Sequence, residues 1–177
     1  MCIMCSGEDR DDVLFHIDAT IERFGWYIQG VVGHEPPALD WAYSIGLAQR
    51  FGHPELVVVG VEAEIAAEAI NDLGEMVRSG RRLAPGSSVE LAKGDVAIGM
   101  VHSAHFETGL MAMWHEYYDK VGPPVPHLEA LQVVFGCGSY CREHQNAVPR
   151  LSNPKARLEQ APPLVPNRGR RRHRRPR

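Results

Sequence analysis

Two segments of the chain repeat apolar residues every three or four positions, which is the period of an amphipathic helix. The first covers residues 11–24 and is followed by Gly25. An aspartate before such a segment and a glycine after it are typical of helix ends. The second begins after Gly60 and ends at Gly80, and its apolar face consists of Ala66, Ala69, Ile70, Leu73 and Val77. The same period predicts a third helix over residues 108–118.

Short runs rich in β-branched, aromatic and aliphatic residues predict strands. These runs are residues 26–32, 42–45, 56–59, 89–91, 96–101 and 128–135. The run 56–59 has no polar side chain, so we expect it to form a central strand that is covered on both faces. Because strands outnumber helices and several are adjacent in sequence, the pattern predicts an α+β fold. We expect a mainly antiparallel sheet packed with two or three helices.

The length of 177 residues is typical of one domain. We expect a single α+β domain over residues 1–145 and a disordered tail rich in proline and arginine over residues 146–177. The formal charge of -3 hides an asymmetry: residues 1–161 hold 12 basic and 22 acidic side chains, a net of -10, whereas residues 162–177 carry +7. Such a tail suits nucleic-acid phosphates, through the arginines Arg170, Arg171, Arg172, Arg174 and Arg175. Alternatively, it lies on the acidic body or aids solubility.

The first residues of the chain lack the basic and apolar regions of an export signal, because acidic side chains follow directly from Glu8. No window approaches the ~20 apolar residues that span a bilayer. We therefore expect a cytoplasmic protein that does not enter a membrane. In a reducing compartment, its four cysteines are expected to be free thiols or metal ligands rather than structural disulfides.

Several blocks of sequence resemble a known bacterial family. The blocks are Trp41-Ala42-Tyr43-Ser44-Ile45-Gly46-Leu47, Phe51-Gly52-His53-Pro54-Glu55-Leu56-Val57-Val58, the helix with Asn71, the turn at Gly80, and Ala130-Leu131-Gln132-Val133-Val134. Together they are similar to the family called domain of unknown function 4262, over most of residues 1–135. The start Cys2-Ile3-Met4-Cys5 is similar to that of many actinobacterial relatives. The resemblance implies no activity, because the family has none that is settled, and the ending from Gly136 onward departs from its pattern.

Cysteines near both ends of the chain are candidates for a structural zinc site. Cys2 and Cys5 have CxxC spacing, and a second group of possible ligands is Cys137, Cys141 and His144. Two intervening residues allow two thiolates to face one tetrahedral ion, and a second pair of ligands would complete the shell. Free thiols and a redox-active CxxC pair are the alternatives.

Ser44, His53 and Glu55 lie within twelve residues of one another and combine a hydroxyl, an imidazole and a carboxylate. A histidine oriented by a carboxylate can activate a hydroxyl for nucleophilic catalysis. Ser44 nevertheless lacks the Gly-x-Ser-x-Gly elbow, and the alternative is a set of polar side chains that satisfy backbone groups. Together with Trp26 and Tyr43, His53 and Glu55 are also candidates for lining a ligand pocket.

A third group consists of His102, His105 and His115, without the His-Glu-x-x-His spacing of a metal-binding helix. We expect ordinary surface or hydrogen-bonded histidines. Because the chain shows no phosphate loop, dinucleotide fingerprint or nucleophile elbow, we favour an accessory module that binds a small ligand or a protein partner. The alternatives are a small hydrolytic or metal-assisted enzyme that uses His53 and Glu55, and a nucleic-acid-associated protein.

Overall fold

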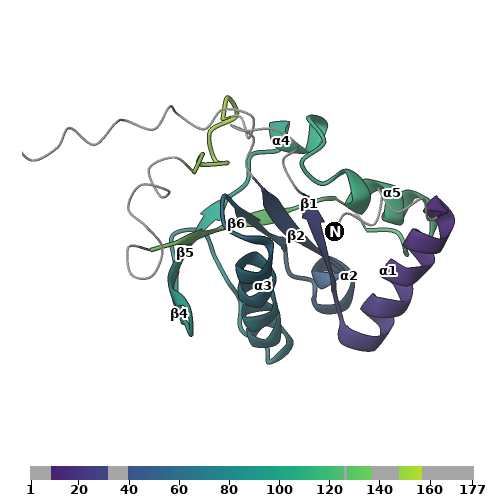
Figure 1. The fold of residues 1–177 in the computed structure, drawn as a ribbon, viewed down its shortest axis with the longest axis horizontal. Coiled ribbons are helices and arrows are strands. Elements are labelled where there is room, and N and C mark those ends of the chain that lie inside the picture. Colours follow the sequence, from purple (N-terminus) through teal and green to yellow (C-terminus); the bar gives the residue numbers. More distant parts are fainter. Residues whose placement is uncertain (1–8, 32–39, 126, 137–147, 157–177) are drawn as a thin grey trace, which may run out of the picture.

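The computed structural model of the chain describes residues 9–31, 40–125, 127–136 and 148–156. These residues form one six-stranded sheet with helices on both of its faces (Figure 1). The strands are β1 (Tyr27–Val31), β2 (Trp41–Ile45), β3 (Glu55–Val59), β4 (Ser88–Leu91), β5 (Gly94–Met100) and β6 (Ala130–Phe135). The helices are α1 (Arg10–Phe24), α2 (Leu47–Phe51), α3 (Ala63–Arg78), α4 (Ala104–Glu107) and α5 (Ala112–Lys120).

The sheet has the strand order β1-β2-β3-β6-β5-β4. All neighbouring strands are antiparallel except β3 and β6, which run parallel. The predicted α+β fold with a mainly antiparallel sheet is therefore confirmed. Strand β3 lies inside the sheet and all five of its residues are buried, as its continuous apolar run predicts.

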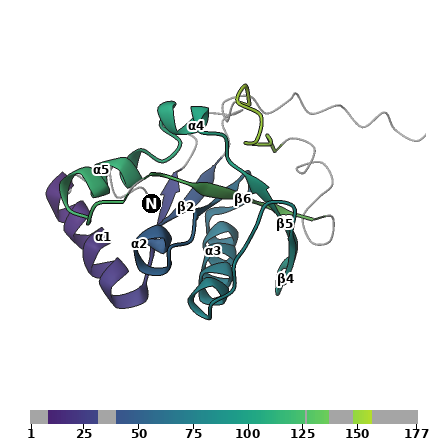
Figure 2. The ribbon, with the colours of Figure 1, turned by 180° about the vertical axis from the view of Figure 1, so that it is seen from behind.

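Successive residues of β3 point to opposite faces of the sheet and so enter two separate cores. Leu56 and Val58 pack with helix α3 on one face, whereas Val57 and Val59 pack with α1 and α5 on the other. Seen from behind, the molecule shows α3 apart from the pair α1 and α5, with the small helix α2 between α1 and α3 (Figure 2). The position of α2 matters because its two ends take part in different contacts, described below.

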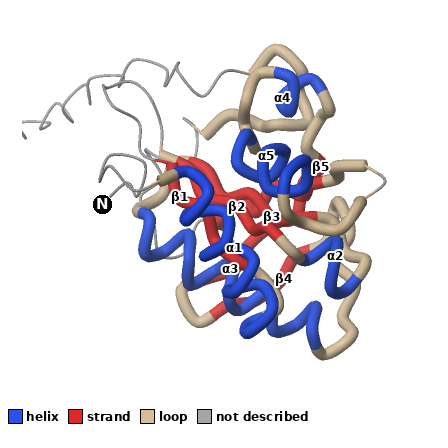
Figure 3. Tube along the Cα trace, turned by 90° about the vertical axis from the view of Figure 1, so that its right-hand side faces the viewer, coloured by secondary structure: helices blue, strands red, loops and turns tan. Residues whose placement is uncertain are grey.

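Two features of the helices differ from the sequence prediction. The helix predicted over residues 108–118 begins only at Ala112, as α5, and a separate short helix, α4, precedes it and ends at Glu107. Gly109, with a positive φ of 88°, lies between the two helices. Figure 3 shows α4 at the far side of the molecule from α3. Helix α2 was not predicted: it has five residues and lies between Gly46 and Gly52, both with positive φ.

Residues 148–156 pack against the sheet, although they fall within the range that the sequence assigns to the tail. Leu151 is fully buried, and the Gln132 side chain of β6 binds the segment at two points. Its amide donates to the Pro149 carbonyl at 2.9 Å, and its oxygen accepts from the Leu151 N–H at 2.9 Å. The arginine-rich part of the predicted tail lies outside the described residues. Within the described part of the chain, no helix has the length and apolar character needed to cross a membrane.

Candidate functional site

Glu55 is a fully buried carboxylate at the start of β3. It accepts hydrogen bonds from three successive backbone N–H groups: Gly46 at 2.9 Å and Ala48 at 3.3 Å to Oε1, and Leu47 at 3.3 Å to Oε2. The Ser44 hydroxyl donates to Oε2 at 2.5 Å, and the Trp114 indole N–H lies 3.4 Å from Oε1. Each oxygen of this carboxylate thus has at least two protein donors within 3.4 Å.

These contacts place Glu55 at the N-terminus of helix α2. The first N–H groups of a helix have no partner inside the helix, and a side chain at the N-cap usually accepts from them. Here the N-cap is Gly46, which has no side chain, so a carboxylate from the neighbouring strand takes that role. Burial raises the pKa of Glu55 to about 6, against the opposing effect of its hydrogen bonds with Ser44 and the helix N–H groups.

His53 is also buried, and both of its ring nitrogens are used by backbone groups. Nδ1 lies 2.7 Å from the Pro54 carbonyl oxygen, and Nε2 accepts from the Leu83 N–H at 3.1 Å. This pattern requires the neutral ring with its proton on Nδ1. Burial, and secondarily the positive charge of Arg82, lower the pKa of His53 and so favour that neutral form.

The structure does not join Ser44, His53 and Glu55 in the hydrogen-bonded chain that the catalytic hypothesis requires. Ser44 does bind Glu55, but its Oγ also accepts from the Leu56 N–H at 2.9 Å. His53 binds neither Ser44 nor Glu55, because its two nitrogens pair with backbone groups. All three side chains are buried and stabilise the backbone between β2 and β3.

The four residues proposed for a ligand pocket do not gather in one cavity. Trp26 belongs to the core on the α3 side of the sheet, and Tyr43 to the core on the α1 and α5 side. The Tyr43 oxygen accepts from the Met113 N–H at 3.2 Å, which ties β2 to α5. The side chain of Trp26 nevertheless reaches the edge of a different hollow, described next.

The remaining sequence candidates divide into two sets. The first set is His102, His105 and His115, of which His105 is buried with its Nε2 2.9 Å from the Asn153 carbonyl oxygen. Among the described residues, no three His, Cys, Asp or Glu side chains are close enough together to hold a metal ion. The second set lies outside the described residues, and consists of Cys2, Cys5, Cys137, Cys141, His144, Arg170, Arg171, Arg172, Arg174 and Arg175.

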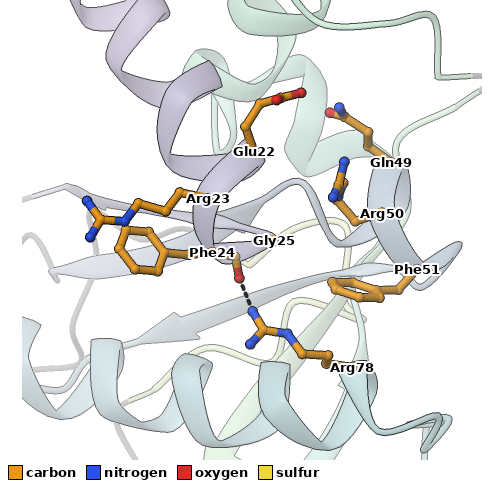
Figure 4. Close-up of a pocket in the computed structure, with 8 residues that line it drawn as sticks. All are labelled: Glu22, Arg23, Phe24, Gly25, Gln49, Arg50, Phe51 and Arg78. Atoms are coloured by element: carbon orange, nitrogen blue, oxygen red, sulfur yellow. Dashed lines mark hydrogen bonds between the residues drawn. The ribbon is translucent and has the colours of Figure 1, made fainter.

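A hollow of about 380 Å³ opens where helices α1, α2 and α3 come to their C-terminal ends (Figure 4). It is lined by Glu22, Arg23, Phe24, Gly25, Gln49, Arg50, Phe51 and Arg78. A second hollow of about 360 Å³ is lined by Thr20, Phe24, Trp26, Ile28, Asn71, Glu75 and Arg78. Because both are lined by Phe24 and Arg78, we treat them together as the helix-end groove.

Arg78 forms the common wall of the helix-end groove and is held by several partners. Its guanidinium donates to the Phe24 carbonyl, as Figure 4 shows, and to the Glu75 carboxylate at 2.9 Å. It also lies 4.6 Å from the centre of the Trp26 ring, a cation–π contact. Trp26 is itself fixed by a hydrogen bond from its indole N–H to Asn71 Oδ1 at 3.1 Å.

Arg50 differs from Arg78 because its guanidinium has no partner among the described residues. Its side chain is exposed and makes no hydrogen bond or ion pair with any residue that the structure describes. In Figure 4 the Glu22 side chain of α1 lies across the hollow from Gln49 and Arg50 of α2. Phe24, with 51% of its surface exposed, and the half-buried Phe51 add apolar area.

Sequence reasoning missed this groove, although each part carried a signal. Arg23, Arg50 and Arg78 each lie in the last turn of a helix, a position that favours a basic residue because of the helix dipole. That rule explains each arginine separately. It does not predict that the three helix ends meet.

A family model described as "Domain of unknown function (DUF4262)" matches residues 20–136 of the chain. The match includes every residue that lines the helix-end groove, together with Ser44, His53 and Glu55. It excludes the cysteines predicted to bind zinc and the arginines of the tail. No curated protein and no solved structure is significantly similar to the chain.

Proposed function

The chain belongs to the DUF4262 family, and we propose that its domain is a binding module whose ligand site is the helix-end groove. One observation carries the proposal: two adjoining hollows share a fixed arginine, Arg78, and an exposed aromatic ring, Phe24. Ligand sites are concave, largely formed in advance, and combine apolar surface with a few polar groups. The helix-end groove has these properties.

The burial of the polar candidates favours a binding module over the enzyme that we considered as an alternative. A general base must reach the proton that it removes. His53 and Glu55 are 1% and 0% exposed, and their polar atoms already bind backbone groups. Catalysis at these residues would first require α2 or the Leu83 segment to move away.

A screen of small fragments by NMR tests the proposal on the full-length protein. Fragments that bind should shift the backbone amides in the last turns of α1, α2 and α3, and these shifts should shrink in Phe24→Ala. Phe15→Ala is the matched control, because Phe15 lies on the same helix with 63% of its surface exposed and lines neither hollow. A set of fragments that shifts amides elsewhere, or that responds equally to both variants, would contradict the proposal.

A structural zinc stays a prediction, as does the cytoplasmic location. If the cysteines and His144 share one ion, native mass spectrometry of protein purified without added metal should show a single zinc. Changing Cys2 and Cys5 to serine should then remove it, because two thiolate ligands are lost. A wild-type mass without metal would end this idea.

Nucleic-acid binding through the tail is a second prediction that rests on sequence. Seven arginines without an acidic neighbour in residues 162–177 favour phosphate contacts whose strength falls with salt. Deletion of residues 162–177 should abolish salt-dependent retention on DNA or RNA. Unchanged retention after the deletion would refute the role of the tail.

A further inference from the structure

We propose that the helix-end groove selects anions, a phosphate or carboxylate group attached to an aromatic ring, and that Arg50 is the residue that binds the negative charge. This inference rests on the proposed function, since it names the ligand class of the same groove. It goes beyond that function because a groove lined by exposed rings would also accept neutral aromatic molecules.

The charge around the groove is opposite to that of the rest of the body. Residues 1–161 carry a net charge of -10, yet five of their twelve basic residues lie in the last turn of α1, α2 or α3 or within four residues after α3: Arg23, Arg50, Arg78, Arg81 and Arg82. The two hollows of the groove are lined by three arginines, Arg23, Arg50 and Arg78, and by two acidic residues, Glu22 and Glu75. A local excess of positive charge on an acidic protein attracts anions to that place and keeps them away from the rest of its surface.

The C-terminal ends of helices oppose an anion, because their unpaired carbonyls carry partial negative charge. At this groove, arginines already cover two of those ends. Arg78 donates to the Phe24 carbonyl at the end of α1, and Arg82 donates to the Gly52 carbonyl beyond α2 at 2.5 Å. The charge of Arg50 is therefore available for a ligand.

The groove also offers rings beside the charge. Phe51 and Phe24 line the hollow that contains Arg50, and Phe24 continues into the second hollow, next to the Trp26 and Arg78 pair. The planar guanidinium suits an oxyanion because it can donate two parallel hydrogen bonds. A ring attached to that oxyanion would cover the exposed face of Phe24.

The carboxylate of Glu22 would compete with an anionic ligand for Arg50. The proposal therefore predicts effects of opposite sign for the two charges. Glu22 lies across the hollow from Arg50 and makes no ion pair with any residue in the described part of the chain. An anionic ligand would be repelled by Glu22 and attracted by Arg50. Removing the Arg50 charge should therefore lower the affinity for anions, and removing the Glu22 charge should raise it. The affinity for neutral aromatic molecules should change little.

The experiment is an NMR titration of the full-length protein at low ionic strength with four probes. Phenyl phosphate and benzoate carry a ring and a charge, inorganic phosphate carries only the charge, and benzyl alcohol carries only the ring. We expect one of the two charged aromatic probes to bind most tightly and to shift amides around Arg50. Whichever of the two is tighter identifies the oxyanion as phosphate or carboxylate.

Three variants locate the charge. Arg50→Gln should weaken the tighter charged probe by roughly tenfold, the loss expected for a charge-assisted hydrogen bond. Glu22→Gln should strengthen it severalfold. Arg81→Gln removes the same charge from an exposed arginine that lines neither hollow, and it should have a much smaller effect.

Equal effects of Arg50→Gln and Arg81→Gln would overturn the role of Arg50, because net charge alone would explain them. Benzyl alcohol binding in the groove as tightly as the charged probes would overturn anion selection and leave the binding module intact. If neither the four probes nor the fragment screen shifts amides in the groove, both proposals are wrong.

Discussion

Replacing Glu55 with glutamine removes one buried charge while keeping the size and shape of the side chain. The amide oxygen can keep the place of Oε1, which accepts from Gly46 and Ala48. The amide nitrogen then takes the place of Oε2, which accepts from the Leu47 N–H and from the Ser44 hydroxyl. The Ser44 hydroxyl can turn and accept from this nitrogen, but the Leu47 N–H cannot and loses its acceptor. In exchange, the substitution ends the burial of a carboxylate.

The two consequences nearly cancel at pH 7. An unsatisfied buried donor costs about 1–3 kcal/mol. The pKa of Glu55 is raised from an ordinary 4.5 to about 6, which makes the charged form less stable by about 2 kcal/mol relative to the unfolded chain. We therefore expect the free energies of unfolding of the wild type and Glu55→Gln to agree within about 1 kcal/mol at this pH.

Lowering the pH should separate the two proteins. Because the pKa of Glu55 is higher in the folded state, its contribution to stability is fully present below pH 4.5 and is lost as the pH rises through about 6. Between pH 7 and pH 5 the wild type should therefore gain about 1 kcal/mol over Glu55→Gln. His53 acts in the opposite direction, since its lowered pKa makes the fold lose stability as the pH falls below 6.5. That loss is common to both proteins.

The assay is urea unfolding of both proteins at pH 7, 6 and 5, followed by tryptophan fluorescence. The quantity of interest is the difference in free energy of unfolding between wild type and variant at each pH. Glu64→Gln is the control, because it removes the same charge from an exposed side chain in the first turn of α3. If the wild type instead loses stability relative to Glu55→Gln on acidification, the hydrogen bonds outweigh burial and the reasoning is wrong.

Two further substitutions test the packing around these sites. Gly74→Ala should lower the free energy of unfolding by about 1–3 kcal/mol, because the added methyl would lie 2.6 Å from the Trp26 ring. Gly30→Ala, which adds a methyl with no atom within 4 Å, should lower it less. Chemical denaturation measures both, and equal losses would contradict the role of the Trp26 contact. His53→Ala should destabilise the fold by about 2–4 kcal/mol, because it leaves the Leu83 N–H without an acceptor and opens a cavity. A loss below about 1 kcal/mol in the same assay would mean that the hydrogen bond between His53 and Leu83 contributes little.

The strands were predictable because each carries its pattern locally. The run 56–59 has apolar side chains on both faces, and β3 is accordingly buried on both. The helices with long apolar faces, α1 and α3, were predictable for the same reason. Helix α2 was not, because five residues between two glycines contain too little of the helical period to be distinguished from a loop.

The sequence left two interpretations of Glu55 open, a catalytic carboxylate or an acceptor for backbone groups, because its partners lie on another element. Beside a serine and a histidine in sequence, a glutamate resembles part of a catalytic group. In the fold, β2 and β3 are antiparallel neighbours, and this pairing brings the Glu55 side chain to the turn after β2, where α2 begins. The pattern of residues within β3 alone could not reveal that Glu55 contacts the start of α2.

Helix α2 joins the buried carboxylate to the proposed ligand site. A helix of five residues is unstable by itself, since nucleation costs more than so few hydrogen bonds return. Glu55 holds its first turn through three N–H groups, and the other end of the helix carries Gln49, Arg50 and Phe51 into the groove. The buried Glu55 carboxylate therefore stabilises the short helix α2, which positions residues of the groove, although burying its charge itself costs free energy. A neutral cap such as glutamine can accept fewer of these N–H groups, so the same helix end would be held less firmly.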